Sequence, residues 1–207
     1  MQPVTSAPKY VDELFLLFRN KGLELTMGEI ADGLHLSRKT LYNLFGSRRG
    51  MIEAVMERFI SELERKIEKS RAAGDDAISG LLKCSGVIER EMGRLRYPFV
   101  RDLLKEYKDI FTVSLLSGCY GKILKENLLY GMKCDLYRKV EDVESLLLFF
   151  ISNLDYLYSS GRIERYYKRL GYLHAELVKF YLYSIVNDQS RILLDAYLKN
   201  SWICLRI

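Results

Sequence analysis

Apolar residues recur at helical spacing from the first segment of the chain to the last. The first apolar stripe, at positions i, i+3, i+4 and i+7, consists of Val11, Leu14, Phe15 and Phe18. This spacing predicts a helix over residues 9–21, and Gly22 directly after it favours a helix end there. Since no segment alternates convincingly with a period of two, the pattern as a whole predicts an all-α fold.

Two more short helices are expected before one long helix. The polar residues that can cap these three helices at their N-termini are Thr26, Ser37 and Ser47. Glu29, three residues after the first of these caps, completes a capping box. Gly46 can close the middle helix in the left-handed conformation. The expected C-terminal ends lie near Leu34, Phe45 and Ala73.

The rest of the chain has the pattern of further helices separated by Gly, Pro, Ser, Asn and Asp. These expected helices cover residues 77–95, 98–107, 111–130, 140–158, 162–186 and 190–202. Gly131 is expected to end the third of them, and Gly171 marks an optional interruption of the fifth. The whole chain would then contain nine or ten helices.

Composition excludes several classes of protein. With 207 residues, 49% of them hydrophobic and 29% charged, the chain has the makeup of a soluble globular protein. Its longest apolar runs, such as Leu146–Ile151, are far too short to cross a bilayer. The first residues, MQPVTSAPKY, lack the apolar core of a secretion signal. We therefore expect a cytoplasmic protein that does not enter a membrane.

Neither a metal site nor an enzyme is indicated. The four cysteines, which form no CxxC pair, are Cys84, Cys119, Cys134 and Cys204. We expect them to be reduced and buried, although a redox-sensing pair remains an alternative. The two histidines, His35 and His174, lie far apart, and helical spacing does not bring His174 to face Glu176. Because the chain lacks a P-loop and a GxGxxG motif, no cofactor is expected.

Residues 30–45, IADGLHLSRKTLYNLF, have the pattern of a helix-turn-helix. Ala31 supplies a small residue where the two helices cross, and Leu41, ten positions later, supplies an inward apolar anchor. His35 lies at the turn, where positive φ is often required and His tolerates it better than most residues. The apolar side chains expected to complete the contact are Ile30, Leu34, Leu36 and Phe45.

The polar residues of the second helix must lie outward if its apolar anchors face inward. Residues 37–49 carry four basic residues and no acidic one, which is the charge pattern expected for phosphate contacts. Arg38 or Lys39 can donate to guanine, and Asn43 can pair with adenine. The Tyr42 hydroxyl can donate to a phosphate. These features favour double-stranded DNA as the partner, with an ordinary helical pair and a solvated basic face as the alternative.

The stretch LTMGEIADGLHLSRKTLYNLFGSRRGMI closely resembles the DNA-binding segment of TetR-like bacterial transcription regulators. The shared features are Thr26, Ile30–Ala31, Ser37, Thr40–Leu41–Tyr42, Phe45, Ser47–Arg48 and Met51. The resemblance implies phosphate contacts from Thr26, Tyr42 and Arg48. It implies a groove-facing set of Ser37, Arg38, Lys39 and Thr40. The departures from the family pattern are His35 for the turn glycine, Leu44 for a frequent histidine, and Arg48–Arg49 for Lys-Glu.

The resemblance also implies an organisation and a function for the whole chain. Residues 1–48 would form the DNA-binding domain, residues 48–73 a joining helix, and residues 74–207 a ligand-binding and dimerisation domain. The implied function is that of a transcriptional regulator, by family habit a repressor. It would bind a palindromic operator as a homodimer and leave the operator when a small-molecule effector binds. A helical module whose helix-turn-helix binds protein is the alternative function.

The second part of the chain is rich in aromatic residues, since 13 of the 15 tyrosines follow residue 95. Rings with polar tips suit a pocket for a partly apolar effector, although each ring suits a helical core equally well. The candidate pocket residues are Tyr107, Phe111, Cys119, Tyr120 and Phe150.

Dimerisation is expected because residues 146–151 are apolar all round, so that their helix must be buried on more than one side. The resemblance implies a four-helix bundle between subunits, built from this helix and a later one around residues 173–186. Burial within one subunit is the alternative. The candidate interface residues are Leu147, Phe150, Ile151, Leu154, Leu177 and Tyr181.

Overall fold

The computed structural model describes residues 8–71, 74–159 and 170–201, and it confirms the all-α prediction. No β-strand forms within these ranges apart from one isolated antiparallel bridge between Tyr137 and Val186. The elements are α1 (Pro8–Lys21), α2 (Met27–Gly33), α3 (Arg38–Phe45), α4 (Arg48–Ser70), α5 (Ala77–Gly93), α6 (Tyr97–Glu106), α7 (Lys108–Phe111), the π-helix η1 (Thr112–Tyr120), α8 (Gly121–Lys133), α9 (Val143–Ser159), α11 (Leu170–Ile185) and α12 (Arg191–Ser201).

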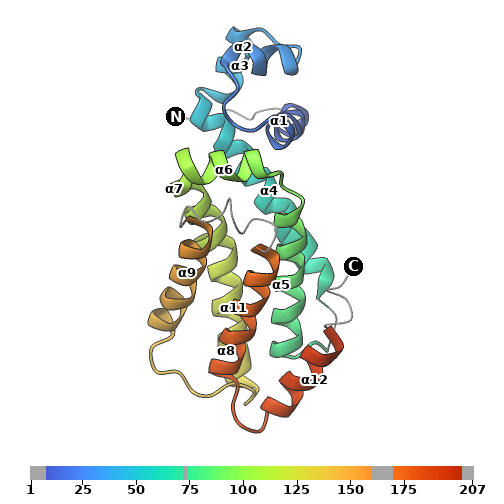
Figure 1. Ribbon diagram of the computed structural model, residues 1–207, viewed down its shortest axis with the longest axis vertical. Helices are drawn as coiled ribbons and strands as arrows, with labels where there is room; N and C mark the ends of the chain where they lie inside the picture. Colours follow the sequence, from blue (N-terminus) through green and yellow to red (C-terminus); the bar gives the residue numbers. More distant parts are fainter. Residues whose placement is uncertain (1–7, 72–73, 160–169, 202–207) are drawn as a thin grey trace.

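The molecule is elongated, with α1, α2 and α3 at one end and the remaining helices in a body below them (Figure 1). The long helix α4 begins at the N-terminal end and continues into the body, where it packs on α5. A single run of buried apolar side chains extends through both parts, from Leu14 and Phe18 to Leu182 and Leu194. None of the described helices is long and apolar enough to span a membrane.

One predicted helix differs from the observed one in its bounds and its geometry. The segment expected over residues 111–130 begins at Lys108, changes into the π-helix η1, and continues as α8 beyond Gly131. The prediction that the helix ends at Gly131 is wrong. This glycine instead allows the Tyr137 ring to pack closely against the helix, because a Cβ there would lie 2.1 Å from that ring. The chain instead turns at Asp135, which adopts a φ of 55°.

The π-helix η1 carries its last residue, Tyr120, into the core of the body. Its wider turns bring backbone carbonyls close to two glycines: a Cβ at Gly118 would lie 2.9 Å from the Val113 oxygen, and one at Gly121 would lie 3.3 Å from the Leu116 oxygen. A larger side chain at either position would therefore clash with these carbonyl oxygens and distort the π-helical backbone. Such helices are rare and are frequently found at functional sites.

Near the C-terminus the described elements follow the prediction where they can be compared. The expected helix over residues 162–186 is described from Leu170 and runs through Gly171 without an interruption; its first part lies outside the described residues. Asn187 accepts a hydrogen bond from the backbone N–H of Ser190 at 2.9 Å, just before α12 begins.

The loop between α1 and α2 is held from two sides through the peptide groups of Leu23. The carboxylate of Asp102 on α6, only 1% exposed, accepts a hydrogen bond from the Leu23 N–H at 2.7 Å. The Arg48 guanidinium on α4 donates to the carbonyl oxygens of Leu23 and Leu25. Gly22 is required beside this junction, because its φ is 85° and a Cβ would lie 2.6 Å from Asp102 Oδ2. The junction fixes the N-terminal helices against the body.

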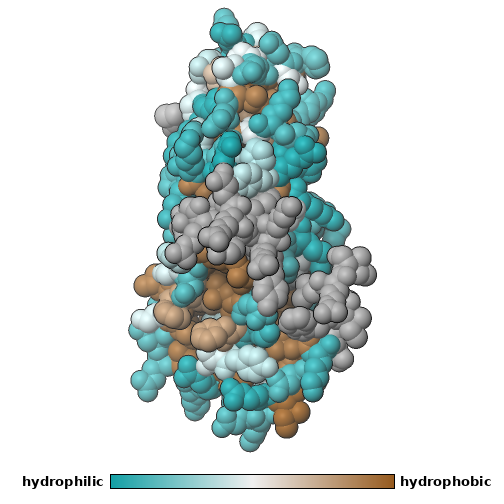
Figure 2. All heavy atoms as spheres, viewed as in Figure 1, coloured by the Kyte–Doolittle hydropathy of each residue, from teal (hydrophilic) through white to brown (hydrophobic). Residues whose placement is uncertain are grey.

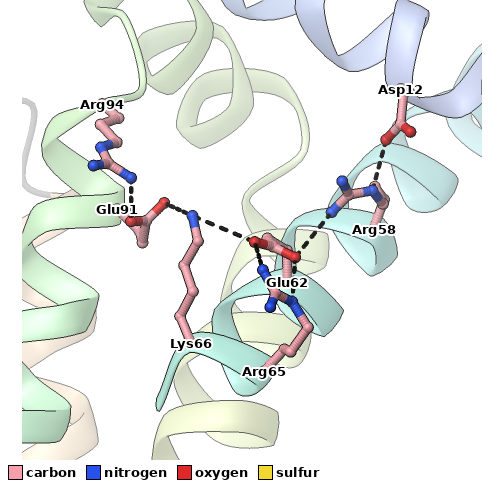
Figure 3. Close-up of polar contacts among 7 residues, drawn as sticks. All are labelled: Asp12, Arg58, Glu62, Arg65, Lys66, Glu91 and Arg94. Carbon is pink, nitrogen blue, oxygen red and sulfur yellow. Dashed lines mark hydrogen bonds and ion pairs between the residues drawn. The ribbon is translucent and has the colours of Figure 1, made fainter. Parts of the chain in front are cut away.

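A ladder of ion pairs also joins α1, α4 and α5 across the surface (Figure 3). Its members are Asp12, Arg58, Glu62, Arg65, Lys66, Glu91 and Arg94. The Arg65 guanidinium hydrogen-bonds the Glu62 carboxylate and, with Lys66 and Arg58 nearby, lowers its pKa to about 2. Since most of these side chains are partly exposed, each pair contributes little alone, but the ladder orients three helices.

We predict that Asp102→Ala destabilises the protein by about 1–3 kcal/mol, because it leaves the buried Leu23 N–H without an acceptor. Chemical denaturation measures the loss, and hydrogen exchange should speed up at the Leu23 amide. Asp109→Ala is the matched control, since Asp109 also joins the body to α4 but through an exposed pair with Arg49. An equal loss in both variants would show that the buried junction has no special role.

Candidate nucleic-acid interface

The helix α2 begins with the predicted capping box. The Thr26 hydroxyl accepts a hydrogen bond from the Glu29 N–H at 3.2 Å, and the Glu29 carboxylate accepts from the Thr26 N–H at 2.7 Å. The hydrogen bond from the Thr26 backbone lowers the pKa of Glu29 below its ordinary value. Thr26 is exposed at this helix N-terminus, and its hydroxyl also donates to Glu29.

The helix α3 begins at the predicted cap, Ser37. Its hydroxyl oxygen accepts from the Thr40 N–H at 3.0 Å and lies 2.8 Å from the Thr40 hydroxyl. Both hydroxyls therefore stabilise the first turn of α3, which leaves each with only part of its hydrogen-bonding capacity for another partner.

The turn between α2 and α3 is tight and left-handed at His35. This residue has a φ of 53°, as the sequence predicted, and it is exposed. The Leu36 N–H donates to the Ala31 carbonyl at 2.9 Å, and the His35 N–H donates to Asp32 at 3.2 Å. The buried side chains that lock the two helices together are Ile30, Ala31, Leu34, Leu41 and Phe45.

Burial of Leu41 and Phe45 leaves four polar side chains on the exposed face of α3. Arg38, Lys39 and Asn43 are exposed, and the Tyr42 side chain is 52% exposed. The Arg38 guanidinium lies over Gly28 of α2, where a Cβ would be 2.6 Å from its Nη2 atom. The structure therefore gathers this predicted set on one surface beside the N-terminus of α2. Thr40 is half-buried below it.

The two arginines at the start of α4 already have partners in the chain. Arg48 donates to the Leu23 and Leu25 carbonyls, so its phosphate contact stays a prediction that would use its remaining donors. Arg49 pairs with Glu53 at 2.9 Å and with Asp109, whose pKa is lowered by that hydrogen bond. The second cation expected here is thus largely neutralised. Leu44 is half-buried, packed against the apolar core.

The candidate pocket residues occupy different places in the body. Phe111, Cys119, Tyr120 and Phe150 are buried, whereas Tyr107 is half-buried at the end of α6. The Tyr120 ring lies 6.1 Å from the Phe150 ring, but Phe111 packs on Tyr158 at 5.3 Å. The structure therefore brings together only part of the set. Burial raises the pKa of Cys119 to about 12, so this thiol is neutral.

A polar cluster in the core was missed by the sequence analysis. The Tyr120 hydroxyl lies 3.3 Å from the Ser85 hydroxyl and 3.2 Å from His174 Nε2. Burial lowers the pKa of His174 to about 4, so the imidazole is uncharged at neutral pH. Two buried polar atoms, His174 Nδ1 and Tyr181 Oη, have no hydrogen-bond partner among the described residues. Each such atom costs about 1–3 kcal/mol.

A surface cleft of about 250 Å³ lies along the N-terminal half of α5 and contains none of the predicted pocket residues. It is lined by Arg71, Asp75, Asp76, Ala77, Gly80, Leu81, Cys84, Ile123, Glu126, Asn127 and Tyr130. Of the cysteines expected to be buried, Cys84 and Cys119 are buried, Cys134 is exposed, and Cys204 lies outside the described residues.

Most of the predicted dimer residues lie in the subunit's own core, which was the alternative to a dimer contact. Leu147, Phe150, Leu154 and Tyr181 are at most 7% exposed, and only Ile151 and Leu177 are half-buried. Little surface of the first four side chains is therefore left for a second subunit, and their place in a dimer interface stays a prediction. The exposed apolar side chains of α9 and α11 are their neighbours, Leu148, Phe149, Tyr156 and Phe180, each 63–67% exposed.

Comparison with known proteins links the N-terminal segment, which contains the site, to one family. Residues 13–55 match the model of the bacterial regulatory proteins of the tetR family. Over 53 residues the chain is 40% identical to YvaF of Bacillus subtilis, an uncharacterized HTH-type transcriptional regulator. This match spans 26% of the chain and 28% of the relative's length.

Solved structures extend the likeness to the body. A transcriptional regulator from Cytophaga hutchinsonii has a TM-score of 0.65 at 17% identity, over 87% of this chain and 98% of the other. The fatty acid degradation regulator FadR from Bacillus halodurans has a TM-score of 0.63 at 13% identity, over 86% and 95% of the two chains. RolR in complex with resorcinol has a TM-score of 0.58 at 17% identity, over 86% of each chain. At these identities the likeness shows a shared fold.

We predict that His35→Gly stabilises the protein by about 0.5–1 kcal/mol, because glycine adopts the positive φ of this turn without the steric cost of a Cβ. Thermal or chemical denaturation measures the gain. His35→Ala, which removes the imidazole but keeps the Cβ, is the control and should give no gain. If alanine stabilises as much as glycine, the benefit comes from loss of the imidazole and not from the backbone.

Proposed function

We propose that the protein is a sequence-specific repressor. The premise is that the chain is TetR-like in its helix-turn-helix segment and in its fold. It binds a palindromic operator as a homodimer and is released by a small-molecule effector. Residues 1–48 form its DNA-binding domain, α4 is the joining helix, and residues 74–207 form the effector-binding and dimerisation domain.

The observation that carries this proposal is the exposed polar face of α3, held rigidly by the buried anchors Leu41 and Phe45. A helix placed with its N-terminal part in the major groove presents such side chains to base edges. Arg38 or Lys39 would donate to guanine, and Asn43 would pair with adenine. Tyr42 would hold a phosphate and so fix the position of the helix on the duplex.

A second phosphate contact would come from the N-terminus of α2. The Thr26 hydroxyl is exposed there, and backbone N–H groups at a helix N-terminus favour an anion. The Ser37 and Thr40 hydroxyls, which already bond each other, would support the position of α3 more than they read bases.

The apolar face on α9 and α11 supports a homodimer. Leu148, Phe149 and Tyr156 on α9 and Phe180 on α11 are large side chains left in solvent. Figure 2 shows hydrophobic residues gathered over this part of the body. A contiguous exposed apolar area of this kind marks an interaction surface. A two-fold dimer would place two copies of α3 about 34–36 Å apart, or at a multiple of this spacing, so that they read a palindrome.

Effector release requires two arrangements of the subunit, of which the effector prefers the one that does not match DNA. The junctions through which the body positions α1–α4 are the Asp102–Leu23 hydrogen bond and the Arg49–Asp109 pair. The resorcinol complex of RolR, a protein of the same fold, supports a small-molecule effector for this chain as well.

We predict that selection from random duplexes will enrich a palindrome. Arg38→Ala should relax the choice at one base by about 1–3 kcal/mol, because a guanine contact is lost. Tyr42→Phe should weaken binding evenly across sequences but leave the slope of log affinity against log salt unchanged, because it removes a hydrogen bond to phosphate and no cation. Fluorescence anisotropy over a salt series measures both effects.

Lys122→Ala, which removes an exposed lysine of α8 in the body, is the control for overall charge and should leave the slope unchanged. If all these variants bind DNA equally weakly and without a preferred sequence, the proposal that the protein reads DNA is refuted. A protein-binding role for the helix-turn-helix would then be favoured.

We predict that Phe149→Glu and Phe180→Glu each convert a dimer into a monomer, because a carboxylate would be buried without a partner in an apolar interface. Sedimentation velocity at micromolar concentration measures the change. Ile192→Glu, at a side chain that is 80% exposed on α12, is the matched control and should sediment as the wild type does. A wild-type monomer, or an unchanged dimer in both variants, would refute this interface.

A further inference from the structure

The polar cluster around Tyr120 lies where three helical segments meet inside an apolar core. Ser85 comes from α5, Tyr120 from the end of η1, and His174 and Tyr181 from α11. The hydroxyl of Tyr120 joins the first and third of these residues, at 3.3 Å and 3.2 Å. His174 and Tyr181 are seven positions apart, and both side chains are directed into the core from the same face of α11.

Two features separate this cluster from ordinary packing. Buried polar atoms in folded proteins are nearly always hydrogen-bonded, yet His174 Nδ1 and Tyr181 Oη have no partner among the described residues. An aromatic ring packs beside each of the two side chains: the Phe150 ring centroid lies 4.5 Å from that of Tyr181, and the Tyr120 ring centroid lies 5.6 Å from that of the imidazole. The cluster thus combines flat aromatic ring faces with two polar atoms that have no hydrogen-bond partner among the described residues.

The electrostatic character of the cluster is neutral. Burial alone lowers the pKa of His174, and burial alone raises the pKa of Tyr181, with no lysine or arginine contributing to either effect. Burial is also the main reason why the pKa of Tyr120 is raised. A carboxylate or phosphate placed here would lose its hydration without gaining a cation from these groups. A neutral group that both donates and accepts hydrogen bonds would match both unused atoms.

We infer that Ser85, Tyr120, His174 and Tyr181 form the recognition site for the effector, and that the effector is an uncharged, flat apolar molecule bearing a hydroxyl group. This inference rests on the proposed ligand response and specifies its chemistry. The hydroxyl bonds both His174 Nδ1 and Tyr181 Oη. The body of the molecule packs on Phe150 and displaces the Tyr120 ring, whose centroid lies only 6.1 Å from that of Phe150.

The position of Tyr120 gives this site a route to the DNA-binding helices. Tyr120 ends η1, and η1 continues from α7, which carries Asp109 and its pair with Arg49 on α4. A molecule that displaces the Tyr120 ring must move or rewind η1, whose π-helical turns are less regular than α-helical ones. The same movement reaches α7 and the start of α4.

The test uses the full-length protein without DNA and three probes with the same ring. These probes are para-cresol, which is neutral with a hydroxyl, para-methylanisole, which cannot donate, and para-toluate, which is an anion. The chain has only two histidines, so nitrogen NMR of the imidazoles resolves His174 with the exposed His35 as internal control. Para-cresol should shift the Nδ1 resonance of His174 and leave His35 unchanged.

Tyr181→Phe should weaken para-cresol binding about ten-fold, because it removes one hydrogen bond and keeps the ring. This variant should fold at least as stably as the wild type, since the hydroxyl it removes has no partner within the described chain. Tyr183→Phe is the matched control on the same helix, because the Tyr183 hydroxyl already donates to Asp195. It should bind para-cresol with wild-type affinity.

Several results would overturn the inference. One is para-toluate or para-methylanisole binding as tightly as para-cresol. Another is a Tyr181→Phe protein with unchanged affinity. A third is a His174 Nδ1 resonance that is hydrogen-bonded in the free protein and unaffected by any probe, which would mean that the site holds an ordered water only.

Failure of the proposed function has a different signature. If para-cresol binds at His174 but no DNA sequence is selected, the recognition site stands without its regulatory role. If DNA is read specifically and no probe reaches His174, the proposed function stands and the site is wrong.

Discussion

The arrangement of the whole molecule depends on how the two peptide groups of one residue, Leu23, are held. Its N–H is bonded by Asp102 from α6 and its carbonyl by Arg48 from α4, so the loop between α1 and α2 has hydrogen bonds on both sides. The first contact is buried and the second is part-buried, and hydrogen bonds to charged groups are strongest where solvent is excluded. The helix-turn-helix is therefore a rigid extension of the body. Any displacement of α6 relative to α4 must move Leu23 or break one of its two hydrogen bonds.

Local features of the sequence predicted the N-terminal helices well because they are governed by short-range chemistry. The caps at Thr26 and Ser37 and the positive φ at His35 each depend on residues no more than four positions away. The side of a helix that faces the core is a long-range property. In α9, Leu147 is buried and Leu148 is 67% exposed, and a segment that is apolar all round gives no sign of this difference.

The polar cluster in the core could not be predicted from the sequence, because it too depends on long-range contacts. Ser85, Tyr120 and His174 are 35 and 54 positions apart along the chain, and no periodic pattern relates them. His174 is one polar residue in an apolar stripe, which usually indicates a satisfied core histidine. Its unsatisfied Nδ1 becomes visible only when the neighbouring helices are in place. The π-helical geometry of η1 was equally hidden, since an apolar run has the same composition in either kind of helix.

Two glycines, one within η1 and one directly after it, have a consequence for how the protein can change during evolution. Gly118 and Gly121 leave room for the carbonyls of Val113 and Leu116, which an ordinary α-helical register would not crowd. Alanine at either position would shift the balance between the two registers without altering any group proposed to touch DNA or effector. In the proposed regulator, substitutions at these two positions would therefore change the sensitivity to the effector while the operator and the chemical specificity stay the same.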